Sequence, residues 1–223
     1  LVMAGNDTEG LRYGTIETSE KHYYLWKENV ENPFNNLLDF HISRMCNKER
    51  LLEIIHNFIV FDAGTKKTCR HNQYFGTKAA QEHIARREGG IIWHTQGSGK
   101  SLTMVWLAKW IRENVKDARV LVITDRTELD DQIEKVFIGV NEKIYRTARG
   151  SDLISTLNQT TPWLICSLVH KFGRQTDDDD SKASEDFIKE LTAKLPSDFK
   201  AKGNIFVFVD ECHRTQSGKL HEA

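Results

Sequence analysis

The sequence predicts an α/β protein in which a parallel sheet is flanked by helices. From residue 71 onward, stretches with helical periodicity alternate with short apolar runs of strand length. One apolar run, at residues 91–94, leads into glycines and then into a helical stretch. Another, at residues 205–209, leads into two adjacent carboxylates. Because repeated strand–helix units form parallel strands with right-handed crossovers, we expect a single parallel sheet.

The N-terminal part of the chain follows a different pattern. Residues 1–28 combine short apolar alternation with an aromatic cluster at 23–26, which predicts a hairpin or edge strands. Residues 30–62 predict two helices, the second over 48–61, and residues 64–68 predict a linker. We therefore expect a short α/β segment, left from a preceding domain, ahead of the parallel sheet.

The remaining elements alternate along the chain in βα order. Helices are predicted at residues 72–87, 100–115, 128–136, 151–159 and 187–195, and strands at 91–94, 119–124, 163–167 and 205–209. Between the last two helices, residues 175–185 contain a run of aspartates and predict a solvated, mobile insertion.

Composition narrows the class of protein only slightly. The chain carries 31 basic and 32 acidic residues, so its net charge gives no signature of nucleic-acid binding, although a local basic face would suffice. Its four cysteines are scattered; Cys69 and His71 are close but lack two further ligands at zinc spacing. No signal peptide or membrane-length apolar run occurs, so we expect a cytoplasmic protein with reduced thiols and no membrane partner.

The glycine-rich segment after residue 94 has the chemistry of a phosphate-binding loop. Gly97, Ser98 and Gly99 lack bulk where a backbone bends around an anion, and their amides can point at phosphates. Lys100 would place its ammonium on the β- and γ-phosphates of ATP, and the Ser101 hydroxyl would ligate Mg²⁺. A Gly-Lys triplet that ends in Ser or Thr arises by chance in about one chain in ten of this length, so the assignment also depends on the flanking strand and helix.

The second motif supplies carboxylates at the end of a predicted strand. Residues 205–209 are apolar on both faces, which is typical of a central strand with helices on both sides. Asp210 then follows at the carboxyl end, where open α/β sheets place their ligands. Asp210 would hold Mg²⁺ through water, and Glu211 would polarise the attacking water. Solvated residues ending a strand are the alternative, but the two motifs together predict a P-loop NTPase.

Several segments resemble the motifs of superfamily 2 helicases. Residues 120–132 resemble motif Ia, residues 165–172 resemble motif Ib, and residues 70–73 stand where these proteins keep an adenine-reading glutamine. The general phosphate-loop pattern has glycine at the position of His94, and superfamily 2 helicases relax that position. We therefore interpret His94 as a variant of the loop, not as a catalytic histidine.

Three motifs have sequences that are more specific than the general superfamily 2 patterns. They resemble the motor (R) subunit of type I restriction-modification enzymes. These are His-Thr-Gln-Gly-Ser-Gly-Lys-Ser at 94–101, Thr-Asp-Arg-x-x-Leu-Asp-Asp-Gln at 124–132 and Val-Asp-Glu-x-His-Arg-Thr-Gln at 209–216. The resemblance covers essentially the whole chain. It implies that residues 1–28 are the tail of a nuclease-like domain, 29–69 a helical linker and 70–223 the first RecA-like lobe.

The resemblance also implies an activity. The parent protein would hydrolyse ATP to pump double-stranded DNA and then cleave it, together with methylation and specificity subunits. Its second RecA-like lobe and its nuclease carboxylates would lie outside these residues, and the strand that inserts beside the Asp-Glu strand would be missing. We therefore expect residues 1–223 alone to bind ATP weakly and to hydrolyse it slowly or not at all.

Site residues can be carried over one by one. Gln73 would contact adenine, and Arg126 and Lys171 would contact the DNA backbone, with a solvated surface charge as the alternative for each cation. The phosphate and Mg²⁺ roles fall on Gly97, Ser98, Gly99, Lys100, Ser101, Asp210 and Glu211.

Three other functions remain open from sequence. A P-loop NTPase that does not act on DNA would explain the phosphate loop but not the helicase-like motifs. A non-catalytic binding module with a relic loop is disfavoured by intact Lys100, Asp210 and Glu211. Another superfamily 2 DNA translocase, or an unwinding helicase, would share all of these motifs.

Overall fold

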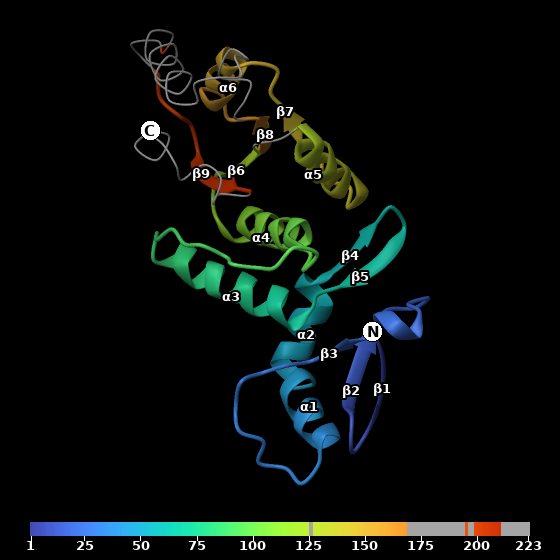
Figure 1. Ribbon diagram of the computed structural model, residues 1–223. Coiled ribbons are helices and arrows are strands. Elements are labelled where there is room, and N and C mark those ends of the chain that lie inside the picture. Colours follow the sequence, from blue (N-terminus) through green and yellow to red (C-terminus); the bar gives the residue numbers. More distant parts are fainter. Residues whose placement is uncertain (125–126, 169–194, 196–198, 211–223) are drawn as a thin grey trace, which may run out of the picture. The chain divides into compact units, whose positions relative to one another are not determined.

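A computed structural model shows the α/β class that the sequence predicts, and it describes residues 1–124, 127–168, 195 and 199–210. The chain divides into two compact units, residues 1–110 and 111–223. Both are drawn in Figure 1.

The first unit begins with a three-stranded antiparallel sheet in the order β1-β2-β3. Its strands are β1 (Val2–Asn6), β2 (Gly10–Gly14) and β3 (Tyr24–Leu25). Strand β2 is the central one and buries Leu11 and Tyr13, whereas β1 is mostly exposed. The hairpin predicted for this region is confirmed.

Two helices follow, each begun by an asparagine cap. The Asn36 side chain accepts a hydrogen bond from the Asp39 amide at the start of α1 (Leu37–Met45), and Asn47 accepts one from the Glu49 amide at the start of α2 (Lys48–Asn57). Helix α2 ends at Asn57, so the prediction of helix to residue 61 is wrong.

The segment after α2 is a second β-hairpin. Strand β4 (Ile59–Asp62) pairs antiparallel with β5 (Thr65–Thr68), so the linker predicted at 64–68 is also wrong. The two turn residues, Ala63 and Gly64, have φ of 48° and 82°, the left-handed values that a tight two-residue hairpin requires. Branched side chains at Ile59 and Val60 favour the strand over a further helical turn.

Helix α3 (His71–Ala85) and helix α4 (Lys100–Asn114) agree with their predictions within two residues. Between them, residues 91–94 are not a strand, and the prediction there is wrong. Ile91 and Trp93 are 68% and 85% exposed. A strand is stabilised by a neighbouring ladder, and none pairs with this segment in the described part of the chain.

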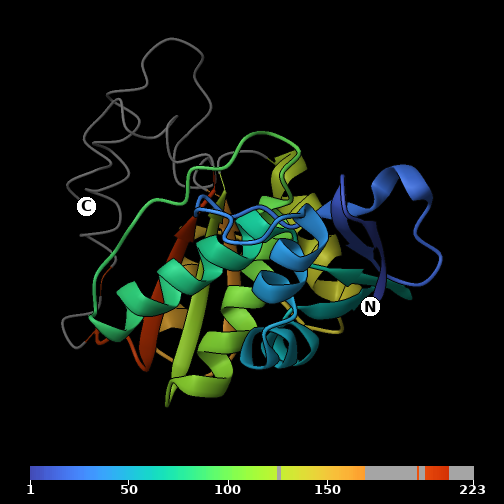
Figure 2. The ribbon, with the colours of Figure 1, turned by 90° about the horizontal axis from the view of Figure 1, so that it is seen from below.

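The second unit contains a four-stranded, wholly parallel sheet in the order β7-β8-β6-β9 (Figure 2). Its strands are β6 (Ala118–Thr124), β7 (Tyr145–Arg146), β8 (Leu164–Leu168) and β9 (Asn204–Val209). Two helices connect them, α5 (Thr127–Gly139) and α6 (Gly150–Leu157). All were predicted except β7, whose two residues give no pattern. The helix predicted at 187–195 and the insertion at 175–185 fall outside the described residues, apart from Leu195.

The position of β9 corrects one expectation. The sequence predicts a central strand, but β9 pairs only with β6 among the described strands and forms the edge of this sheet. Val207 and Val209 are accordingly 51% and 45% exposed, whereas every residue of β8 is buried. An apolar run alone reveals that a strand can be covered on both faces, not which strands lie beside it.

No helix in the described residues has the length and apolar character needed to cross a membrane.

Candidate functional site: the phosphate loop

The candidate phosphate-binding loop leads directly into α4, which begins at Lys100. Gly97 and Gly99 have φ of 76° and 85°, in the left-handed region that favours glycine. The loop closes by a hydrogen bond from the Ser98 amide to the Thr95 carbonyl at 3.2 Å. The first amides of a helix have no intrahelical acceptor, so the start of α4 offers N–H groups to an anion.

Two features of the loop are compatible with a bound phosphate group. A Cβ on Gly97 would have no atom within 4 Å, so the loop is open on that side. Ser98 is 8% exposed, and its hydroxyl is buried with no hydrogen-bond partner in the described structure. A buried, unsatisfied hydroxyl is costly unless a ligand or water completes it. The predicted loop residues therefore form a site suited to the phosphates of a nucleotide.

Gln73 lies against this loop from the first turn of α3. Its Oε1 accepts a hydrogen bond from the Arg70 amide at 2.8 Å, and its Nε2 donates one to the Gly99 carbonyl at 2.9 Å. The side chain is 2% exposed, and a Cβ on Gly99 would come within 2.3 Å of its Nε2. The structure thus brings Gln73 and the loop together, while the contact of Gln73 with adenine remains a prediction.

Arg70 also reaches the loop, which the sequence analysis did not foresee. Its Nη1 donates a hydrogen bond to the Gly97 carbonyl at 3.2 Å, and its guanidinium lies 5.0 Å from the centre of the Tyr24 ring. These partners lie 27 and 46 residues away in the chain, so no local pattern could indicate them. In the sequence, its position at the start of the segment that contains Gln73 could have indicated a role for Arg70 at the loop.

His94 packs behind the loop. Its ring lies against α3 at Gly76, where an added Cβ would be 3.3 Å from the imidazole. Burial lowers the pKa of His94, and the nearby charge of Lys100 lowers it further. The packing of the ring on α3 is compatible with our interpretation of His94 as part of the loop, and its role there remains a prediction.

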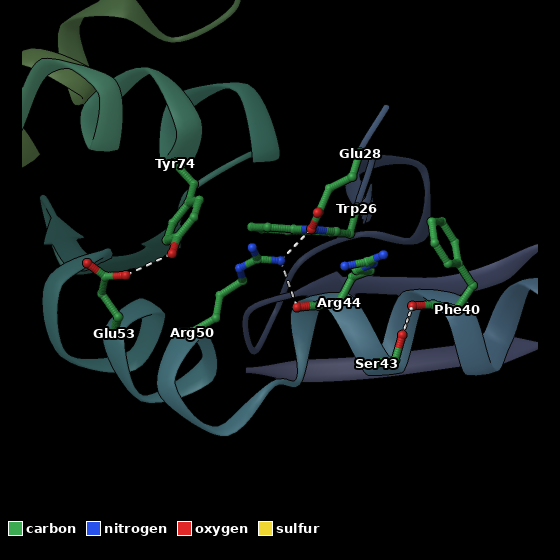
Figure 3. Close-up of polar contacts among 8 residues, drawn as sticks. All are labelled: Trp26, Glu28, Phe40, Ser43, Arg44, Arg50, Glu53 and Tyr74. Carbon is green, nitrogen blue, oxygen red and sulfur yellow. Dashed lines mark hydrogen bonds and ion pairs between the residues drawn. The ribbon is translucent and has the colours of Figure 1, made fainter. Parts of the chain in front are cut away.

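The start of α3 is anchored by a cluster of aromatic and charged side chains from the loop after β3 and from α1, α2 and α3 (Figure 3). Arg50 forms an ion pair with Glu28, donates to the Arg44 carbonyl at 2.8 Å and lies 5.6 Å from the Tyr74 ring. Tyr74 in turn donates to Glu53 at 2.8 Å. Burial and this carboxylate raise the pKa of Tyr74 to about 12, so it remains a donor. The residue next to Gln73 is therefore fixed in place.

The carboxylate motif belongs to the second unit. Asp210 follows β9, and its amide donates to the Ile123 carbonyl at 3.0 Å, which fixes it beside the carboxyl end of β6. Thr124, the last residue of β6, is buried, and its hydroxyl has no partner among the described residues. Asp210 therefore stands at the edge of the sheet where ligands of open α/β folds bind. Glu211, Arg126 and Lys171 lie outside the described residues.

The sequence of the chain matches that of a known protein family. A sequence model of the SWI2/SNF2 ATPase family matches residues 72–223. The chain belongs to the SWI2/SNF2 ATPase family. Membership explains why a phosphate loop and an Asp-Glu strand end occur in this order, and it establishes the use of a nucleotide.

This SWI2/SNF2 ATPase is similar to curated restriction enzyme subunits. A putative type I restriction enzyme MjaIXP endonuclease subunit of Methanocaldococcus jannaschii is 29% identical, over 98% of this chain and 23% of the relative. The type I restriction enzyme SauCOLORF180P endonuclease subunit of Staphylococcus aureus is 25% identical, over 99% of this chain and 23% of the relative. The chain thus spans about a quarter of these proteins.

The chain is also similar to a shorter restriction subunit and to one solved structure. The C-terminal part of a putative type I restriction enzyme MpnIIP endonuclease subunit of Mycoplasma pneumoniae is 28% identical, over 88% of this chain and 96% of the relative. Among solved structures, T4 UvsW has a TM-score of 0.45 and 12% identity, over 78% of this chain and 36% of that one. The second similarity is too low to support an argument. The resemblance that the motifs predict is confirmed by the restriction subunits.

Proposed function

We propose that this chain is the ATP-binding part of a type I restriction enzyme motor, which pumps double-stranded DNA before the parent enzyme cleaves it. The observation that carries the proposal is the phosphate loop before α4, inside a SWI2/SNF2 ATPase match. Its glycines are left-handed, and its Ser98 hydroxyl has no hydrogen-bond partner among the described residues. The restriction subunits similar to the chain supply the biological context. The methylation and specificity subunits would be its partners.

In this proposal the loop holds the triphosphate by its backbone. The glycines leave room for the anion, the first amides of α4 bind it, and the ammonium of Lys100 neutralises the β- and γ-phosphates. Ser101 and Asp210 would hold Mg²⁺, which when bound neutralises the charge that develops during phosphoryl transfer. No cluster of three His, Cys, Asp or Glu occurs in the described part of the chain, but Mg²⁺ in nucleotide sites takes most ligands from phosphates and water.

The remaining roles complete the proposed motor. Glu211 would orient the attacking water, and Arg126 and Lys171 would contact the DNA backbone. Residues 1–28 would belong to a nuclease-like domain, and the first RecA-like lobe would cover 70–223. A cytoplasmic location is also part of the proposal, in keeping with the three free cysteines of the described chain.

Translocation can be tested with the complete polypeptide and its partner subunits on a duplex that carries a third strand downstream of the recognition site. ATP-dependent displacement of the third strand is expected, and Lys100→Ala should abolish it because the phosphates lose their cation. Lys109→Ala removes a second lysine from α4 and should displace the third strand at the wild-type rate. Equal displacement by Lys100→Ala would contradict the proposal.

A further inference from the structure

Two side chains at the start of α3 hold the carbonyls of both glycines in the phosphate loop. Gln73 donates to Gly99 at 2.9 Å, and Arg70 donates to Gly97 at 3.2 Å. We infer that Arg70 and Gln73 are positioning residues that keep the loop in its anion-binding shape, and that Tyr24 orients Arg70. The inference rests on the proposed function, because the loop must bind phosphates for its shape to matter.

The backbone chemistry of the loop explains the need for such donors. A loop that turns its N–H groups toward an anion leaves carbonyl oxygens on its outer side, and these require donors of their own. The Gly99 carbonyl accepts hydrogen bonds from the Thr103 amide at 3.2 Å and from the Thr103 hydroxyl at 3.4 Å, both within α4, and Gln73 adds a shorter bond from α3 at 2.9 Å. Gln73 therefore ties the first turn of α4 to the first turn of α3.

The same bonds argue against Gln73 as a free reader of the base. Its Oε1 is engaged by the Arg70 amide, its Nε2 by Gly99, and only 2% of the residue is exposed. Because the side chain is almost fully buried, adenine could reach this amide only if Gln73 or the residues that cover it moved. In the conformation described, Gln73 acts on the phosphates through the loop.

Tyr24 extends this arrangement to the N-terminal sheet. The Tyr24 ring lies 5.0 Å from the guanidinium of Arg70, and Tyr24 pairs with Tyr13 in β2. A cation held over an aromatic face loses freedom to swing into solvent. The N-terminal sheet thus reaches the phosphate loop through two residues, Tyr24 and Arg70.

The inference can be separated from a base-reading role by three probes with Mg²⁺, namely ATP, GTP and inorganic tripolyphosphate, which has no base. We expect Gln73→Met and Arg70→Met to weaken binding of all three probes by a similar factor, about fivefold to tenfold for one lost hydrogen bond. Isothermal titration of the complete polypeptide would measure each affinity. A base reader would instead lose ATP affinity and keep tripolyphosphate affinity, which would overturn the inference.

Matched variants distinguish a positioning role from a general loss of packing in the protein. Gln81→Met removes another buried glutamine from α3 and should leave all three affinities unchanged. Arg70→Lys should bind between wild type and Arg70→Met, because a lysine can still donate to Gly97. Tyr24→Phe keeps the ring and should match wild type, whereas Tyr24→Leu should weaken binding by about threefold.

The binding results distinguish failure of the positioning inference from failure of the proposed function. Thermal melting of each variant shows whether it is folded, and Gln73→Glu is a second test because its carboxylate can accept from Arg70 but cannot donate to Gly99. Wild-type binding that is lost in Lys100→Ala but unchanged in Gln73→Met, Gln73→Glu and Arg70→Met would refute the inference alone. Failure of the wild type to bind any probe would refute the proposed function and the inference with it.

Discussion

At the scale of single residues, Arg119 is a charged side chain that is almost fully buried in the second unit, with 2% of the residue exposed. Its guanidinium is surrounded by backbone carbonyls at the end of α6 and in the adjoining loops, namely those of Thr156, Leu157, Gln159, Pro162 and Lys202. Burial lowers the pKa of Arg119, but an arginine stays charged in proteins. The negative end of the α6 dipole stabilises that charge.

Replacement of Arg119 by Met should destabilise the second unit strongly. Hydrogen bonds to a charged group contribute about 1.5–3 kcal/mol each, so we expect the free energy of unfolding to fall by about 3 kcal/mol or more. Urea denaturation followed by circular dichroism measures the change. Arg112→Met is the control, because the Arg112 side chain is 52% exposed and its ion pair with Glu142 should contribute about 1 kcal/mol or less. Equal losses in the two variants would show that the carbonyl cluster is unimportant.

His41 gives a prediction about pH. Its Nδ1 accepts a hydrogen bond from the Leu11 amide at 3.0 Å, and burial lowers the pKa of the imidazole. The unfolded chain therefore binds the proton more readily than the folded one. The stability that the neutral ring contributes is complete above pH of about 6.5 and is lost as the pH falls below it.

This dependence can be measured by urea denaturation at a series of pH values between 5 and 8. We expect the stability of the wild type to decline below about pH 6.5, and His41→Leu to flatten that decline. His22 is exposed, so His22→Gln should keep the wild-type profile. A profile that is the same in wild type and His41→Leu would show that His41 is not responsible.

Sequence reasoning found the residues of the site whose chemistry is local. The run from Gly97 to Ser101 carries its glycines, lysine and hydroxyl within five positions, so the loop could be predicted. Arg70 and Arg119 could not, because each acts on carbonyls that lie 27 or more residues away. A charged side chain that binds backbone leaves no complementary residue in the sequence.

At the scale of elements, helical stretches were predicted well because their periodicity is long. The buried residues of α3 and α4 recur at helical spacing over several turns. Strands were less certain, because a short apolar run does not specify its partner. The same kind of run formed the sheet edge at β9 and no strand at residues 91–94, and the β4–β5 hairpin was missed.

The hairpin turn provides a test at this scale. Ala63 has φ of 48°, which is strained for alanine but natural for asparagine. Ala63→Asn should therefore raise the free energy of unfolding by about 0.5–1 kcal/mol. Ala79→Asn is the control, because Ala79 is an exposed residue of α3, where asparagine is a poorer helix former than alanine and should lower the free energy of unfolding slightly. A loss of stability in Ala63→Asn would contradict the assigned turn.

At the scale of the whole molecule, the protein family was predicted more securely than the order of the strands. The family depends on short motifs whose chemistry stays close in sequence, and it is confirmed by the match over residues 72–223. The edge position of β9 depends on which strands pair across long separations, which no motif encodes. The motifs were therefore sufficient to predict the protein family, whereas the order of the strands could be seen only in the structure.

The central claim is that this chain supplies the ATP site of a motor driven along DNA, and the rate of ATP hydrolysis tests it most directly. The complete polypeptide should hydrolyse ATP faster when duplex DNA is present, and Lys100→Ala should remove that activity while Lys109→Ala keeps it. Hydrolysis that duplex DNA does not change, or phosphorylation of a small acceptor in place of hydrolysis, would contradict the claim.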